Sequence, residues 1–376
     1  MLLLAFMTGG LLLSREKQKE EPEEEVVVIP DNYENNIVNS CSLPTSILNV
    51  IIDYTNAYYK SLYTLEYVDT SDLFCYEMSA VLSEYATKLQ IDSRKLYDYD
   101  FSMSDAHYDL KITDYYSSNG VYYVDVLQND TFYFKYLNGI ESNAYGIEIT
   151  YAITLDGSDY KIKYIDKVQD YWVIFDDPIS TDEIIDIYNT TLASISSSIN
   201  AKQASYTPSS NWIHQYNREK AREYIDAYYH DRNDEYYDFT NIGGNCQNYA
   251  SQAIYYAGIP MDLQDEVWKY FDSENDDSCD KTGRSSSWTG VVEFYNYCKD
   301  NEEGGIVADV NVPLQYGEVG DVIQVGFNNC FRHTTIISKV VDGHILVNSN
   351  SVDLHDYPVE AYVYPLVRLI KILGYN

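Results

Sequence analysis

The sequence predicts an α+β protein with two domains. Its length of 376 residues is sufficient for two hydrophobic cores. Two helical stretches come first and a row of strand-like runs follows them, which is typical of an α+β domain with an antiparallel sheet. A second group of helical and strand-like segments begins near residue 211 and continues to the C-terminus.

The N-terminal half contains helical stretches at residues 46–65 and 78–92, followed by an antiparallel meander. The strand-like runs are 105–116, 121–138, 143–155 and 160–175. Asn-Gly or Asp-Gly turn signals occur at residues 119–120, 138–139 and 156–157. This element order resembles the cone-shaped folds of the cystatin and nuclear-transport-factor type. We expect an accessory α+β domain over residues 46–178, without a catalytic constellation.

The N-terminal segment predicts export. Residues 1–13 are almost wholly apolar, and residues 14–45 are charged and rich in asparagine. A membrane-spanning helix needs about 20 apolar residues, so the first segment fits a signal peptide better. We expect residues 1–13 to be an export signal or membrane anchor and residues 14–45 to be an acidic linker. The protein is then secreted or membrane-anchored; a cytoplasmic location is the alternative.

A linker joins the two halves. Residues 179–210 contain a helical stretch from 181 to about 200, followed by a Ser- and Pro-containing segment at 205–210. We interpret residues 179–210 as a linker with a helix, and residues 211–376 as a C-terminal domain that folds alone.

The composition excludes some partners. A formal net charge of −34 argues against binding nucleic acid or an anionic membrane surface through bulk electrostatics. The 41 tyrosines could stack on sugars or peptides, although tyrosine is also a good strand residue. The six cysteines form no CxxC pair or zinc-site spacing, so we expect no metal and no cofactor. The composition does not define the oligomeric state.

Cys246 follows two glycines and Asn245, and it begins a helix-like pattern. Small and apolar residues from 249 to 257 share one helical face, and Gly258 marks the helix end. The free N–H groups and the dipole of a helix N-terminus favour a thiolate. We expect the glycines to allow a sharp turn that leaves the sulfur exposed as a nucleophile. A buried structural cysteine is the alternative.

His333 begins a β-branched, strand-like run, and Asn350 and Asp353 follow on the next run. The order Cys, His, then Asn or Asp is that of papain-like cysteine hydrolases. We therefore predict that Cys246 is the nucleophile and that His333 transfers the proton.

The third catalytic residue is predicted from the hairpin between these runs. Residues 342–343 are an Asp-Gly pair, which predicts a two-residue turn. Counting outward from that turn, Asn350 lies on the same sheet face as His333 and diagonal to it, whereas Asp353 points to the opposite face. We therefore expect Asn350 to orient the imidazole. A β-bulge would reverse the assignment in favour of Asp353.

The C-terminal half combines several short motifs. They are Asn211-Trp212, residues 216–221, the GGNCQNYASQ stretch around Cys246, Ser287-Trp288, residues 320–324 and Arg332-His333. This combination resembles the putative amidase domain family of Gram-positive bacteria, a papain-like group related to cell-wall peptidases. The resemblance covers about residues 211–376. It implies a papain-like α+β domain in which a helix that begins with the nucleophile packs on an antiparallel sheet.

The chain departs from the family pattern at three positions. The family usually has Asp before the cysteine and Thr after it, where this chain has Asn245 and Gln247. Where the family tends to have a second histidine, this chain has Asn350.

Three functions follow from these observations. The first is a cysteine-dependent amide-bond hydrolase of the Cys-His-Asn type, and the resemblance implies peptidoglycan peptides or a related amide as substrate. The second is a catalytically degenerate protein that binds a cell-wall or spore component. The third is a transglutaminase-like acyl transferase that uses the same cysteine and histidine.

Overall fold

The computed structural model describes residues 36–167, 173–175, 178, 180–200, 205–264, 267–271, 283–301 and 304–376. The protein is a mixed α+β protein with a mainly antiparallel sheet, as the sequence predicts. The predicted signal or anchor, residues 1–13, lies outside the described residues. Within those residues, no helix is long and apolar enough to cross a membrane.

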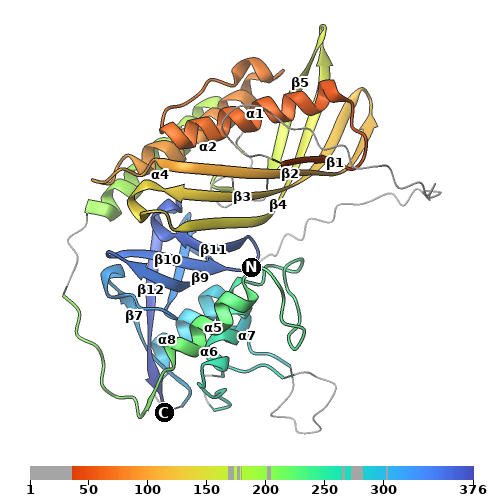
Figure 1. Ribbon diagram of the computed structural model, residues 1–376. Coiled ribbons are helices and arrows are strands. Elements are labelled where there is room, and N and C mark those ends of the chain that lie inside the picture. The colour runs from red at the N-terminus through yellow and green to blue at the C-terminus, as the bar shows by residue number, and fades with distance from the viewer. Residues whose placement is uncertain are drawn as a thin grey trace.

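The N-terminal half packs helices against an antiparallel meander. Its helices are α1 (Thr45–Thr64), α2 (Glu77–Arg94) and α4 (Thr181–Asn200). Its strands are β1 (Asn36–Asn39), β2 (Met103–Ser118), β3 (Val121–Phe134), β4 (Glu141–Asp156) and β5 (Asp159–Lys167). Figure 1 shows these helices along one face of the meander.

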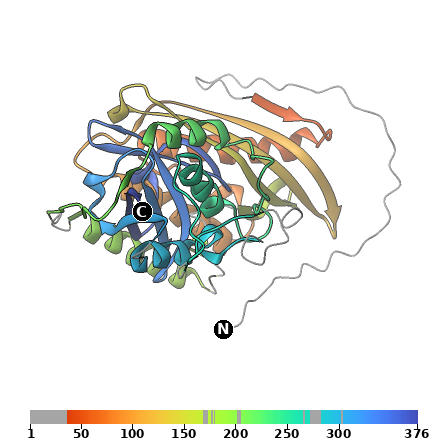
Figure 2. The same ribbon diagram turned by 90° about the horizontal axis from the view of Figure 1, so that it is seen from below.

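The C-terminal half has a group of helices beside a second set of strands. Its helices are α5 (Arg218–Tyr228), α6 (Cys246–Tyr256), α7 (Ser286–Thr289) and α8 (Val291–Asp300). Its strands are β6 (His214–Gln215), β7 (Ile306–Val312), β8 (Val322–Phe327), β9 (Cys330–Val341), β10 (His344–Ser349), β11 (Asp353–Pro358) and β12 (Leu366–Tyr375). Seen from below, α5 and α6 lie over these strands (Figure 2).

The sequence predicts most elements of the N-terminal half, with differences at three strands. β3 ends at Phe134, whereas the predicted run continued to residue 138. β5 ends at Lys167; of the rest of the predicted run, residues 168–172 lie outside the described residues and 173–175 are not a strand. The prediction of a linker over residues 14–45 is wrong for Asn36–Asn39, which form β1 and pair in parallel with β2. This strand is short and follows the charged segment, so no local pattern predicts it. It forms because it pairs with β2, which lies far along the chain.

The two halves share one sheet. Its order is β1-β2-β3-β4-β11-β10-β9-β8-β12-β6, with β5 paired to β4 and β7 paired to β12. The junction is the antiparallel pair β4–β11, where Leu354 is opposite Ala144. Beside it, the buried Ser142 hydroxyl donates a hydrogen bond of 2.7 Å to the Asp356 carbonyl.

The main hydrophobic core also crosses this junction. One cluster of buried side chains includes Ile47 and Phe134 from the N-terminal half together with Val325, Ile337 and Leu346 from the C-terminal half. Two smaller clusters lie around α5, α6 and α8. Most of the apolar burial that stabilises the C-terminal strands therefore involves the N-terminal half.

The predicted linker segment 205–210 is held against the C-terminal half. Asp309 of β7 accepts hydrogen bonds from the Tyr206 hydroxyl at 2.5 Å and from the Ser209 backbone N–H at 2.9 Å.

The β9–β10 hairpin begins as predicted and then shifts its register. Asp342 and Gly343 both have positive φ, and Val341 pairs with His344 across the two-residue turn. Leu346 is opposite Lys339, but the next residue, Val347, is opposite Ile337. Ser338 is therefore an extra residue in β9, which forms a bulge.

The bulge overturns the predicted pairing around the candidate site. Asn348 is opposite Ile336, so the simple count that placed Asn350 diagonal to His333 is wrong by one residue. Moreover, β10 ends at Ser349, and Asn350 lies in the turn that follows.

A truncated chain tests the shared core. We expect a fragment of residues 211–376 to melt at a lower temperature than the full chain, or to aggregate, because it exposes β11 as an open edge and uncovers part of the core. Circular dichroism and size-exclusion chromatography measure both effects.

The matched control is the full chain with a protease site inserted within residues 205–210. After cleavage, the two halves should stay associated and keep the melting temperature of the intact chain. A fragment as stable as the full chain would show that the C-terminal half folds independently.

Candidate active site

Cys246 is the first residue of α6, as the sequence predicts. Gly243 and Gly244 precede it with φ of +94° and +100°, a backbone conformation that side chains other than glycine rarely adopt. The backbone thus turns sharply before the helix and brings the cysteine against β9.

The Cys246 side chain is buried, which corrects the expectation of an exposed sulfur. It is 6% exposed, and the other residues of the first two turns of α6 are buried as well. The reason is that α6 packs between α5, α7 and β9 rather than along the surface. A substrate must therefore reach the sulfur from a restricted direction.

Burial raises the pKa of the Cys246 thiol, but its polar neighbours outweigh this effect. The charge of His333 and a side-chain hydrogen bond with it lower the pKa, and so do the backbone N–H groups of Thr334 and Gln247. The net pKa lies below the ordinary value of 9.0. These contacts favour the thiolate, as the helix N-terminus also does.

The structure thus brings together the two residues that the sequence predicts as nucleophile and proton carrier. His333 lies on β9 and is 8% exposed. The ring of Tyr362 lies beside the imidazole, with 6.2 Å between the ring centroids and 32° between the planes. Tyr362 therefore limits the movement of the histidine ring on that side.

Asn350 occupies a different place from the one predicted. Its amide donates to the carbonyl groups of Tyr228 and Tyr229 at 3.0 and 3.4 Å. Its oxygen accepts a hydrogen bond of 2.7 Å from the Asn245 amide. These contacts place Asn350 under the loop that precedes Cys246 and do not bring it to His333.

Asn245 connects this loop to its surroundings. Its side-chain oxygen accepts from the Phe239 backbone N–H at 3.2 Å and from the Asn248 amide at 2.8 Å. Its backbone N–H donates to the Ser351 hydroxyl. Ser351 has a φ of +117°, which is strained for a residue with a side chain. This strained residue lies in the turn after β10, where it supports the loop that precedes Cys246.

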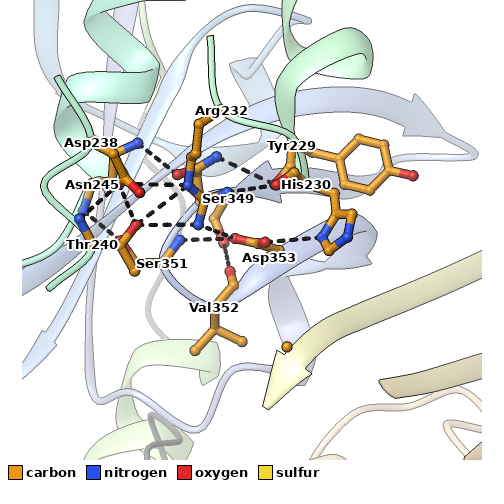
Figure 3. Close-up of polar contacts among 12 residues, drawn as sticks. Tyr229, His230, Arg232, Asp238, Thr240, Asn245, Ser349, Ser351, Val352 and Asp353 are labelled. Atoms are coloured by element: carbon orange, nitrogen blue, oxygen red, sulfur yellow. Dashed lines mark hydrogen bonds and ion pairs between the residues drawn. The ribbon is translucent and has the colours of Figure 1, made fainter. Parts of the chain in front are cut away.

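Asp353 belongs to a second network beside this turn (Figure 3). Its carboxylate accepts from Arg232 at 2.9 Å and from the Ser351 backbone N–H at 3.2 Å, and it lies 3.1 Å from the His230 ring nitrogen. Arg232 also donates to the His230 carbonyl at 2.8 Å. Asp353 therefore clamps the turn to the segment after α5, and these contacts do not place it at His333.

Gln247 fixes α6 to β9 from inside. It is fully buried, and its carbonyl oxygen accepts from the Thr334 hydroxyl at 2.9 Å and from Gln324 at 3.3 Å. Gln324 in turn accepts from Arg368 at 2.9 Å. Since Thr334 directly follows His333, this network sets the distance between the helix and the strand that carry the candidate pair.

Several of these contributors were not predicted from the sequence. The sequence signals nothing about Tyr362, because it approaches from the segment before β12. The difference from the family pattern at Asn245 could have indicated a side chain with a structural role next to Cys246. Among the described residues, no three His, Cys, Asp or Glu side chains gather in a way that could hold a metal ion.

Comparison with known proteins finds a family match over the C-terminal half. The model of the family described as "Putative amidase domain" matches residues 215–369, which include Cys246 and His333. This match confirms the resemblance inferred from the sequence motifs and indicates amide-bond hydrolysis as the general class of reaction. No curated protein and no solved structure matches the chain.

The role of Asn350 can be tested by substitution. We expect Asn350→Ala to lower the free energy of unfolding by about 2–4 kcal/mol, because it leaves the buried Asn245 amide and the carbonyl group of Tyr228 unsatisfied. Urea denaturation measures this loss.

Asn350→Asp is the matched control, since it keeps the shape and one acceptor but removes the donor. It should be destabilised as well. If Asn350→Ala instead keeps full stability and loses catalysis, Asn350 acts on His333 as the sequence predicted.

Proposed function

We propose that the protein is a cysteine-dependent amide-bond hydrolase. The observation that carries the proposal is the buried Cys246–His333 pair, in which the pKa of the thiol is lowered in spite of its burial. A buried structural cysteine has a raised pKa, as Cys298 has in this chain. The match to an amidase family model supports the same class of reaction.

The chemistry would proceed in two stages. The Cys246 thiolate attacks the carbonyl carbon of the amide, and His333 donates a proton to the nitrogen as the C–N bond breaks. A thioester remains on the sulfur. His333 then removes a proton from water, which attacks the thioester carbonyl, releases the carboxylic acid and restores the pair.

The proposed substrates are peptides of peptidoglycan, or a related amide outside the cytoplasm. The sequence motifs support this class through their resemblance to a group related to cell-wall peptidases. The apolar N-terminal segment supports export. The third element of the proposed site is the turn 350–352, which two polar networks hold in place. This turn positions the loop before Cys246, in place of a direct contact with the imidazole.

Thiol reactivity tests the nucleophile. Alkylation of Cys246 by iodoacetamide should reach its plateau at a lower pH than alkylation of Cys41 or Cys75, because the pKa of Cys246 is lowered and the pKa values of both others are raised by burial. Mass spectrometry of each labelled peptide across a pH series measures this order.

His333→Ala should move the Cys246 profile toward higher pH, because it removes the charge and the hydrogen bond that favour the thiolate. If Cys246 titrates like Cys75 in the native protein, the nucleophile assignment is wrong.

Product analysis tests the reaction. Purified full-length protein should release peptides with new carboxyl or amino ends from peptidoglycan, as detected by mass spectrometry. Cys246→Ala should reduce release by at least about a thousandfold, since the attacking atom is lost. Cys75→Ser is the matched control and should leave the rate unchanged.

Added amines separate hydrolysis from acyl transfer. A transferase would produce amine adducts in place of free acids. A native protein without any turnover on wall peptides, and with an unreactive Cys246, would instead favour the binding function.

A further inference from the structure

Arg94, the last residue of α2, is a buried charge with two unpaired nitrogen atoms. The residue is 1% exposed, and its Nε and Nη1 atoms have no hydrogen-bond partner. Arginine is almost never fully buried unless it is paired, because taking an unpaired charge out of water costs several kcal/mol. This position therefore calls for an explanation.

Two aromatic rings compensate the charge only in part. The guanidinium carbon lies 5.6 Å from the ring centroids of both Phe101 and Phe134. Ring faces attract a cation, but they do not replace the directed acceptors that the N–H groups of a guanidinium need. The Nε and Nη1 atoms of Arg94 therefore still lack an acceptor.

Arg94 lines a cavity of about 60 Å³ between the two halves of the protein. A single water molecule needs roughly 10–15 Å³ of cavity volume, so the cavity has room for about five water-sized groups. Its walls come from α1, α2, β3 and β4 on one side and from the segments around β11 on the other. Most of the lining is apolar, including Leu62, Phe132, Val352 and Leu354.

The one carboxylate in the wall is engaged elsewhere. Burial raises the pKa of Asp130 to about 6, and the attraction of Lys167 opposes this shift. The Asp130 carboxylate accepts a hydrogen bond of 2.8 Å from Gln128. Gln90, also in the wall, donates to the Tyr58 hydroxyl at 2.9 Å. None of these polar contacts supplies an acceptor to the guanidinium.

We propose that this cavity is a binding site for a small monocarboxylate of about four to six non-hydrogen atoms, with Arg94 as its anchor. A carboxylate matches the guanidinium geometrically and supplies the missing negative oxygens. The apolar walls contact the hydrocarbon part of the ligand. Inorganic phosphate has no hydrocarbon part. In this cavity it would lose its hydration shell, and the apolar walls would offer no hydrogen bonds in return.

The site is separate from the Cys246–His333 pair but lies close to it. Tyr362 lines the cavity, and the same ring lies beside His333. Val352, another wall residue, belongs to the turn that supports the nucleophile loop. The ligand site does not depend on the proposed hydrolase activity.

Ligand binding by the full chain tests the site. We would follow thermal unfolding and isothermal titration in a carboxylate-free buffer with acetate, propionate and butyrate as probes. At least one of these carboxylates should raise the melting temperature by several degrees at millimolar concentration. Propionamide, which has the same shape as propionate without the charge, should have no effect.

Variants of Arg94 link the response to the residue. Arg94→Met should weaken carboxylate binding at least tenfold, whereas Arg284→Met, at an exposed arginine outside the cavity lining, should bind as the wild type does. Without ligand, Arg94→Met should melt at the same or a higher temperature, because it removes a buried charge that the neighbouring groups compensate only in part.

Three results would overturn the proposal. They are the absence of any carboxylate response, an equal response to propionamide, and full retention of binding in Arg94→Met. A lower melting temperature of Arg94→Met without carboxylate binding by the wild type would show that Arg94 is structural and that the cavity holds water only.

Discussion

The hydrogen bond between Asn245 and Asn350 is the constraint on which the candidate site depends. It joins the loop before α6 to the turn after β10, and so it sets where the helix that begins with Cys246 starts. An amide suits this position because it accepts from Phe239 and Asn248 and also donates to Asn350. A carboxylate, which the family usually has at this position, accepts hydrogen bonds but cannot donate. The two departures at 245 and 350 therefore complement each other.

The environment of Cys246 favours the thiolate through the groups in contact with the sulfur, in a chain of strongly negative net charge. The formal net charge is −34, and if every carboxylate acted equally on the sulfur, this charge would disfavour the Cys246 thiolate. However, solvent and salt screen surface charges beyond about 10 Å. A buried sulfur responds mainly to the groups in contact with it, which here are His333 and two backbone N–H groups.

Features with strong local signals could be predicted from the sequence. The start of α6 at Cys246, the turn at residues 342–343 and the meander of the N-terminal half all follow from nearby residues. The bulge at Ser338 could not, because a partner far along the chain stabilises it. The Ser338 hydroxyl donates to Asp356 on β11 at 2.7 Å, and Lys339 binds the same carboxylate. That long-range contact stabilises the bulge, and the bulge changes the register that was expected for Asn350. The pairing of Cys246 with His333 was predicted from local signals.

The contact between Ser142 and Asp356 joins residues 214 positions apart. During synthesis, the N-terminal half emerges first, and at the junction β4 is paired only with β3 until β11 has left the ribosome. The turn that supports the loop before Cys246 directly precedes β11 and emerges at nearly the same time. A nascent chain that ends before residue 356 therefore lacks the finished support of its thiol. In this order of synthesis, the support around Cys246 forms only after β11 has been made.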